Sequence, residues 1–246
     1  MFRDIPFGGP WITDKELDYV TDACRNGWYA NWSGYIDRFE QAMAKATGNA
    51  HALATSSCTG ALHLAMKALE LGPGDEVIVP EVTWIATASC VCYVGATPVF
   101  ADVEKDTWCL DPESVRRAIT PRTKAIIPVH MYGHPSDMDA LNAIADEHGI
   151  TVIEDAAPGI GSLYKGRPAG SLGLGSAFSF QGAKPLVTGE GGMLLTNDGN
   201  LFDRASYYAD HCREPGKTLL PTGIGLKYKI SNLQAALGLA QVERME

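Results

Sequence analysis

Asp155 and Lys184 are the residues of this sequence whose types and positions most favour chemistry. Asp155 ends the apolar run Thr151–Glu154, and Lys184 follows a second apolar run over 176–180. An Asp at the carboxyl end of a buried strand can pair with a protonated ring nitrogen, because open α/β sheets place their sites at this edge. A lysine in a partly desolvated loop is more readily the neutral amine that forms an imine with an aldehyde. The ordinary alternatives are that Asp155 caps the next helix and that Lys184 is a solvated surface charge.

Two further segments place polar or aromatic side chains where a ligand can bind. Ser57, Cys58 and Thr59 join a short strand to a helix. The free N–H groups of a helix start and the helix dipole favour a phosphate dianion there. Trp84 follows the strand predicted over 76–80, and a flat ring can stack on its side chain. The alternatives are an ordinary polar N-cap for the first segment and a core position for Trp84.

The elements that must position these residues alternate between short apolar runs and amphipathic stretches. This pattern predicts an α/β fold with a mainly parallel central sheet flanked by helices on both faces. The expected strands are 76–80, 97–101, 124–129, 151–154, 176–180 and 192–196. The expected helices are 13–27, 35–47, 60–71, one from about Asn200 and one from Ser231. In the first helix, which begins at the capping box Thr13–Glu16, we expect Leu17, Val20 and Cys24 to share the buried face.

Composition disfavours several classes of protein. The 246 residues carry a net charge of −9 with no Lys/Arg-rich block, which disfavours nucleic acid or anionic lipid as a partner. No stretch approaches the ~20 apolar residues of a membrane span. The opening Met1–Pro6 lacks a secretory signal, so we expect a cytoplasmic protein in which the six cysteines stay reduced. The cysteine spacing predicts no metal site, and no linker divides the chain.

In this order, the four chemical segments resemble the DegT/StrS-type sugar aminotransferases, a branch of the fold-type I enzymes that use pyridoxal 5'-phosphate (PLP). The similarity extends over essentially the whole chain, including the segments Ile5–Pro10, Gly74–Pro80 and Pro128–Gly133. It is greatest to perosamine-synthase-like members, which act on a nucleotide-linked 4-keto-6-deoxyhexose. The resemblance implies transfer of an amino group from glutamate to such a keto-sugar, for polysaccharide or glycan biosynthesis.

The resemblance also implies a role for each candidate residue. Lys184 holds PLP through an imine and moves the proton during transfer, Asp155 pairs with the pyridine nitrogen, and Trp84 covers one face of the ring. The phosphate is surrounded by Ser57, Cys58, Thr59 and Ser179. The implied assembly is a homodimer with shared active sites, in which Asn232 reaches the phosphate bound by the neighbouring subunit.

Two departures from the family pattern are present. Pro158 stands where many relatives carry Gln, His or Glu to contact the ring hydroxyl of the cofactor, and proline has no side-chain donor for that contact. The second departure is length, because family members usually continue into a smaller C-terminal domain. We therefore expect residues 1–246 to form the PLP-binding large domain, with the small domain absent or truncated.

Three other functions compete with amino transfer. A related branch dehydrates sugars with PLP and carries His at the lysine position, so Lys184 favours transfer. A truncated relative that only binds a sugar nucleotide or a partner is the non-enzymatic alternative. A nucleotide-binding oxidoreductase is disfavoured, because Gly159-Ile160-Gly161 and Gly173-Leu174-Gly175 lack the final glycine of that motif.

Overall fold

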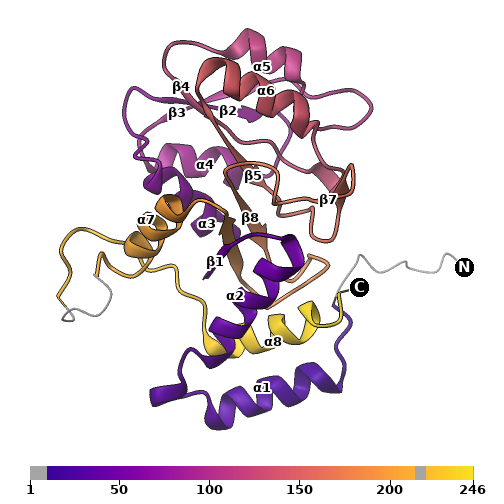
Figure 1. Cartoon of the computed structure of the whole chain (residues 1–246), viewed down its shortest axis with the longest axis vertical. Helices are drawn as coiled ribbons and strands as arrows, with labels where there is room; N and C mark the ends of the chain where they lie inside the picture. The colour runs from indigo at the N-terminus through magenta and orange to yellow at the C-terminus, as the bar shows by residue number, and fades with distance from the viewer. Residues whose placement is uncertain (1–9, 214–219, 246) are drawn as a thin grey trace, which may run out of the picture.

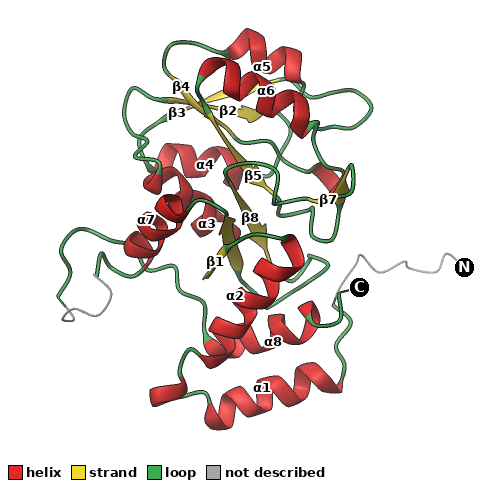
Figure 2. Cartoon of the chain, in the orientation of Figure 1, coloured by secondary structure: helices red, strands yellow, loops and turns green. Residues whose placement is uncertain are grey.

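A seven-stranded sheet forms the centre of the molecule (Figure 1; Figure 2). The computed structural model describes residues 10–213 and 220–245. The strands follow the order β1-β9-β8-β5-β4-β2-β3, and every neighbouring pair is parallel except the two that β9 forms. They are β1 (His51–Thr55), β2 (Glu76–Pro80), β3 (Thr97–Ala101), β4 (Thr123–Ile126), β5 (Thr151–Asp155), β8 (Gly175–Ser179) and β9 (Gly192–Thr196). A separate hairpin pairs β6 (Leu163–Tyr164) with β7 (Arg167–Pro168).

Helices cover both faces of this sheet. The helices are α1 (Asp14–Asn26), η1 (Tyr29–Asn31), α2 (Gly34–Thr47), α3 (Cys58–Ala68), α4 (Ala86–Tyr93), α5 (Pro112–Ala118), η2 (Met131–Gly133), α6 (Met138–His148), α7 (Gly199–Ala209) and α8 (Asn232–Val242). One face packs against α3, α4 and α7, and the other packs against α5 and α6 at one end and α2 and α8 at the other. Helix α1 lies against α8 in an outer position (Figure 1).

The layers follow from the alternation of side chains along buried strands. In β2, Val77 and Val79 join the core beneath α3 and α4, whereas Ile78 joins the core beneath α5 and α6. A strand that is buried on both faces is typical of a parallel sheet between two helical layers. The predicted α/β fold with a mainly parallel sheet and helices on both faces is confirmed.

The strand predictions hold with small shifts at the ends. The strand expected over 124–129 ends at Ile126, because Pro128 has no N–H to continue the ladder. Val129 still forms a bridge with Asp155, whose N–H donates to the Pro128 carbonyl at 2.9 Å. The β6–β7 hairpin was not predicted, because two-residue strands carry no periodic signal.

Of the face predicted to be buried in the first helix, Val20 packs against the core, but Leu17 and Cys24 do not. Leu17 is 59% exposed and Cys24 is exposed, whereas Glu16 and Ala23 are buried. The Glu16 carboxylate turns inward because it accepts hydrogen bonds from the Thr13 N–H at 2.7 Å and from Arg244 Nε at 2.9 Å. A charged side chain that is paired in this way can take an inner position.

Three strands place their ends side by side at the carboxyl edge of the sheet. Gly192 opens β9 and pairs with Thr55 of β1 on one side and with Ser179 of β8 on the other. A Cβ atom at position 192 would overlap the backbone of Ser57 and Cys58, so only glycine allows the turn before α3 to lie this close. The start of α3 and the end of β8 are therefore neighbours.

Glu40 of α2 protects the open edge of β1. Strand β1 is at the end of the sheet, and its Ala54 N–H donates to Glu40 Oε1 at 2.7 Å. Burial raises the pKa of Glu40 to about 7, and the nearby Asp37 charge adds to this rise while the Ala54 N–H opposes it. Ionised Glu40 is thus an unfavourable, partly buried charge that accepts one hydrogen bond from the outer edge of β1.

We predict that Glu40→Gln stabilises the protein above neutral pH. Folding raises the pKa of Glu40 from 4.5 to about 7. Glu40 therefore contributes fully to the free energy of unfolding below pH 4.5, and this contribution is lost as the pH rises through about 7. The glutamine amide does not ionise, so the variant avoids this loss of up to ~3 kcal/mol in the free energy of unfolding. Its side-chain oxygen can still accept the hydrogen bond from the Ala54 N–H. Thermal unfolding should give a higher midpoint for the variant at pH 8 and little difference at pH 5. Asp18→Asn, on an exposed turn of α1, is the matched control; an equal effect of Glu40→Gln at both pH values would contradict the prediction.

We also predict that Gly192→Ala lowers the midpoint of thermal unfolding. The added methyl overlaps rigid backbone at the start of α3, and such overpacking destabilises by about 1–3 kcal/mol. Gly182→Ala, in the loop that follows β8, is the control, because a methyl there would meet only the Gly189 carbonyl at 3.8 Å. A midpoint that falls equally in both variants would show that close packing at Gly192 is not the cause.

Candidate active site

Asp155 is a buried carboxylate at the end of β5. Its Oδ2 accepts a hydrogen bond from Thr87 Oγ1 at 2.7 Å, and its Oδ1 accepts from the Ala157 N–H at 3.2 Å. Burial raises the pKa of Asp155, while the Thr87 and Ala157 hydrogen bonds and the Lys184 charge oppose this rise. Among the described residues Asp155 forms no ion pair, so it can accept a hydrogen bond from a cationic ligand. The alternative interpretation, in which Asp155 only caps a helix, fails because an irregular turn follows β5.

Glu154, the acid before Asp155, lies on the opposite side of the strand. It accepts backbone N–H bonds from Gly170, Leu172 and Gly173 at 2.7–2.8 Å and contacts His130 Nε2 at 2.8 Å. Neighbouring residues of a strand point to opposite faces, so only one of the two acids can belong to the site. Glu154 instead holds the segment between β7 and β8 through these backbone hydrogen bonds.

Lys184 lies in the loop between β8 and β9 and is half-buried. Its N–H donates to the Gln181 carbonyl at 2.9 Å, and the Gly182 N–H donates to the Gly189 carbonyl at 3.0 Å. Its ammonium group forms no hydrogen bond or ion pair with residues 10–213 or 220–245. Burial raises the pKa values of Asp155 and of the Cys58 thiol, and the charge of Lys184 lowers both. Lys184 follows β8, the strand that pairs with β5, so its loop continues from the edge of the sheet at which Asp155 ends.

The turn before α3 offers an anion site beside Asp155. Ser57 caps the helix by accepting the Gly60 N–H on its Oγ at 3.0 Å, whereas the N–H groups of Cys58 and Thr59 have no acceptor in the described part of the chain. The Cys58 Sγ lies 4.0 Å from Asp155 Oδ1, which brings this turn next to the carboxylate. Ser179, buried at the end of β8, accepts the Gln181 N–H at 3.4 Å and keeps its own O–H free to donate.

Trp84 and Asn232 have different surroundings. The Trp84 side chain is 79% exposed in the segment between β2 and α4, so the core alternative for this residue is wrong. Its role against a ring face stays a prediction. Asn232 is only 8% exposed; its Oδ1 accepts the Tyr35 N–H at 2.9 Å, and its Nδ2 donates to the carbonyls of Gly27 and Asn31 at 3.3 and 3.4 Å. Contact with a neighbouring subunit's phosphate also stays a prediction, and it requires Nδ2 to give up one of its two donations.

Thr87 is the member of the site that the sequence interpretation missed. Its hydroxyl contacts Asp155 directly, and it lies 3.0 Å from the hydroxyl of Thr83. The available signal was the i,i+4 spacing of two threonines at the carboxyl end of a predicted strand, since this spacing places them on the same helix face. Pro158 lies in the turn that follows Asp155 and adds no donor to the site.

These residues fit a small molecule with three different ends. A carboxylate suits a protonated ring nitrogen, an uncommitted amine suits an aldehyde, and a helix start with free N–H groups suits a phosphate. The 4.0 Å between Cys58 Sγ and Asp155 Oδ1 places the helix start beside the carboxylate, and Lys184 follows the neighbouring strand β8. This set of donors and acceptors matches PLP.

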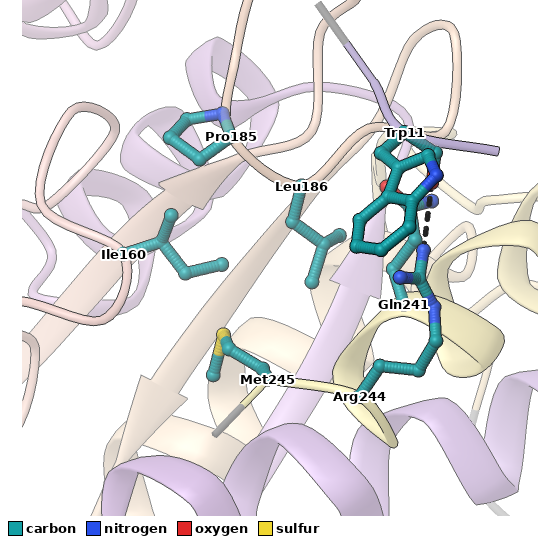
Figure 3. A pocket seen from close by; sticks show the side chains of 7 residues that line it. All are labelled: Trp11, Ile160, Pro185, Leu186, Gln241, Arg244 and Met245. Carbon is teal, nitrogen blue, oxygen red and sulfur yellow. Dashed lines mark hydrogen bonds between the residues drawn. The ribbon is translucent and has the colours of Figure 1, made fainter.

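A pocket of about 220 Å³ is lined by residues from the loop after β8 and from the end of α8 (Figure 3). Pro185 and Leu186 come from the loop of Lys184, and Arg244 closes another side by donating to the Trp11 carbonyl at 2.7 Å. The lining residues are Trp11, Ile160, Pro185, Leu186, Gln241, Arg244 and Met245. None of them is a predicted site residue, so this pocket is not the candidate site.

The described residues contain no helix long and apolar enough to cross a membrane. Within the same ranges, no group of three or more His, Cys, Asp or Glu side chains is arranged to hold a metal ion.

Comparison with known proteins identifies the family. The model of the DegT/DnrJ/EryC1/StrS aminotransferase family matches residues 10–246. Over 242 residues the chain is 44% identical to the GDP-perosamine synthase of Caulobacter vibrioides, covering 98% of this chain and 65% of that protein. It is 42% identical over 252 residues to the spore coat polysaccharide biosynthesis protein SpsC of Bacillus subtilis, covering 98% and 64%. The chain thus spans about two thirds of the length of these curated relatives.

A solved structure agrees with this assignment. The PLP form of Spr1654 from Streptococcus pneumoniae superposes with a TM-score of 0.91 at 32% identity, covering 98% of this chain and 66% of that one. The predicted type I aminotransferase fold is confirmed. The chain belongs to the DegT/DnrJ/EryC1/StrS aminotransferase family.

Proposed function

We propose that residues 1–246 form the PLP-binding large domain of an aminotransferase that moves an amino group from glutamate to a nucleotide-linked keto-sugar. The observation that carries this proposal is that Cys58 Sγ at the start of α3 lies 4.0 Å from Asp155 Oδ1, while Lys184 follows β8, the strand that pairs with β5. Each group alone has an ordinary structural role. Their convergence at the carboxyl edge of the sheet favours a shared ligand.

The cofactor we propose is PLP, which supplies an aldehyde for amines and a ring that stabilises negative charge at the reacting carbon. Asp155 would hold the ring nitrogen, because a buried carboxylate attracts a protonated nitrogen more strongly than an exposed one does. Cys58 and Thr59 would bind the phosphate through their N–H groups, with Ser57 and Ser179 adding hydroxyls. Trp84 would cover one face of the ring and exclude water from it.

Lys184 would have two tasks in this site. Its amine would bond to the cofactor aldehyde in the resting protein, and after release it would carry a proton at the substrate carbon. Both tasks need an amine that is not committed to an ion pair, as observed among the described residues. Lys184 is half-buried in the loop that follows β8, the strand that pairs with β5.

The substrate class is the finer part of the proposal. GDP-perosamine synthase and SpsC match this chain at 44% and 42% identity, a difference too small to select one sugar. We propose a nucleotide-linked 4-keto-6-deoxyhexose as the acceptor, for polysaccharide or glycan biosynthesis. The relatives extend beyond the matched region by about a third of their length, and we expect that third to help enclose the sugar.

We further propose that the protein works as a homodimer. Trp28, Tyr29 and Trp32 lie around η1 with half or more of their side chains exposed, and Tyr29 reaches 95%. Tyr29 also has a φ of 53°, an uncommon conformation for a bulky residue. Exposed aromatic clusters of this kind mark protein interfaces. A second copy of this chain is the occupant that the family assignment favours.

The transfer reaction is tested with Lys184→Ala. We expect the protein to move labelled nitrogen from glutamate to a GDP-linked 4-keto-6-deoxyhexose, and the variant to lose a factor of about 10²–10⁴ in rate. Lys45→Ala, at an exposed position of α2, is the matched control and should keep the wild-type rate. Unchanged turnover in Lys184→Ala would contradict the assignment. PLP binding without transfer to any keto-sugar would favour a binding role.

The dimer is tested by molar mass in solution. Light scattering should give twice the chain mass for the wild-type protein and one chain mass for Tyr29→Asp, because a buried unpaired charge disfavours the interface. Leu163→Asp, on the exposed β6–β7 hairpin, should stay dimeric. A wild-type protein of one chain mass at every concentration would exclude the proposed assembly.

A further inference from the structure

Thr83, Thr87 and Asp155 form a chain of hydrogen bonds that leads into the candidate site. Thr87 is fully buried, and its Oγ1 donates to Asp155 Oδ2 at 2.7 Å. Thr83 is half-buried, with its Oγ1 at 3.0 Å from that of Thr87. An ionised carboxylate only accepts, so the single hydroxyl hydrogen of Thr87 must point to Asp155. The Thr83 hydroxyl must then be the donor to Thr87.

We propose that Thr87 is a positioning residue that holds the Asp155 carboxylate in place and ionised for a protonated ring nitrogen, with Thr83 orienting the Thr87 hydroxyl. This inference rests on the proposed function, because it assigns Asp155 to the ring of PLP. It adds two residues that act through Asp155 and do not touch the cofactor themselves. Within the described part of the chain, Thr87 is the one donor to Oδ2, whereas Oδ1 accepts from the Ala157 N–H at 3.2 Å and from the Cys58 thiol at 4.0 Å.

The surroundings of Asp155 explain why a neutral donor matters. The titratable groups that influence it are Cys58 from α3, Cys90 from α4, His130 after β4 and Lys184 after β8. Burial raises the pKa of both thiols, and the Asp155 charge raises them further, so the thiols stay neutral. The charge of Lys184 changes when its amine reacts. A hydroxyl keeps its hydrogen throughout the pH range of the reaction, so Thr87 supports the carboxylate in every state.

The sign of the effect follows from the influences on Asp155. Burial raises its pKa, and the Thr87 hydrogen bond opposes that rise. Removing the hydroxyl therefore raises the pKa of Asp155 further, and the carboxylate is protonated at a higher pH. Only the ionised carboxylate holds a protonated ring nitrogen. As the pH is lowered, PLP affinity should therefore begin to fall at a higher pH in such a variant than in the wild-type protein.

The test compares Thr87→Val with Thr87→Ser in the purified protein. Val keeps the shape of Thr without the hydroxyl, whereas Ser keeps the hydroxyl. The dissociation constant of PLP is measured by fluorescence titration from pH 5.5 to 9. We expect Thr87→Val to bind PLP about tenfold more weakly at pH 7, because the loss of a hydrogen bond to a charged group has an effect of about this size. As the pH is lowered, the variant should also lose affinity for PLP at a higher pH than the wild type does. Thr87→Ser should restore both properties.

Two results would overturn the inference. One is an unchanged dissociation constant and pH dependence in Thr87→Val, and the other is a Thr87→Ser variant that behaves like Thr87→Val. If Thr87→Val fails to fold, Thr83→Val carries the test, since it removes the donor to Thr87 from a half-buried position. It should shift the pH dependence in the same direction by a smaller amount, and no shift would overturn the proposal.

Asp155→Asn separates this inference from the proposed function. If Asp155→Asn binds PLP as tightly as the wild type, Asp155 does not hold the ring and the proposed function fails. If Asp155→Asn loses affinity while Thr87→Val keeps it, only the positioning role of Thr87 fails.

Discussion

The burial of the Asp155 carboxylate is the constraint on which the candidate site depends. Moving an ionised carboxylate out of water is unfavourable unless hydrogen bonds and nearby charge compensate. Here the Thr87 hydroxyl, the Ala157 N–H and the Lys184 charge supply that compensation, and none of them forms an ion pair with the carboxylate. Asp155 therefore remains able to bind a cation that arrives with a ligand.

The sheet brings the remaining groups to this carboxylate. Strands β1, β5 and β8 are parallel, so Thr55, Asp155 and Ser179 all end at the same edge. Gly192 lets the turn before α3 approach the first residue of β9, and this approach places Cys58 4.0 Å from Asp155. The convergence of amine, carboxylate and helix start thus follows from strand direction and from one small residue.

The sequence predicted the strand ends that carry Asp155 and Ser179, because apolar runs bounded by polar residues mark buried strands. It also predicted a polar N-cap in the segment of Ser57, Cys58 and Thr59 as the alternative to a phosphate site, and in the structure Ser57 is that cap. The sequence did not predict contacts between residues that are far apart in the chain. The inward turn of Glu16 depends on Arg244, at the other end of the chain, and the hydrogen bonds of Asn232 depend on the turn between α1 and α2. Neither partner has a local signal.

Chemical trapping of the cofactor tests the central claim most directly. The protein is loaded with PLP, treated with borohydride to reduce any bond between a lysine and the cofactor aldehyde, and digested for mass spectrometry. The account predicts one modified peptide, which contains Lys184. Modification of a different lysine, or of none, would contradict the claim that Lys184 and Asp155 hold the same ring.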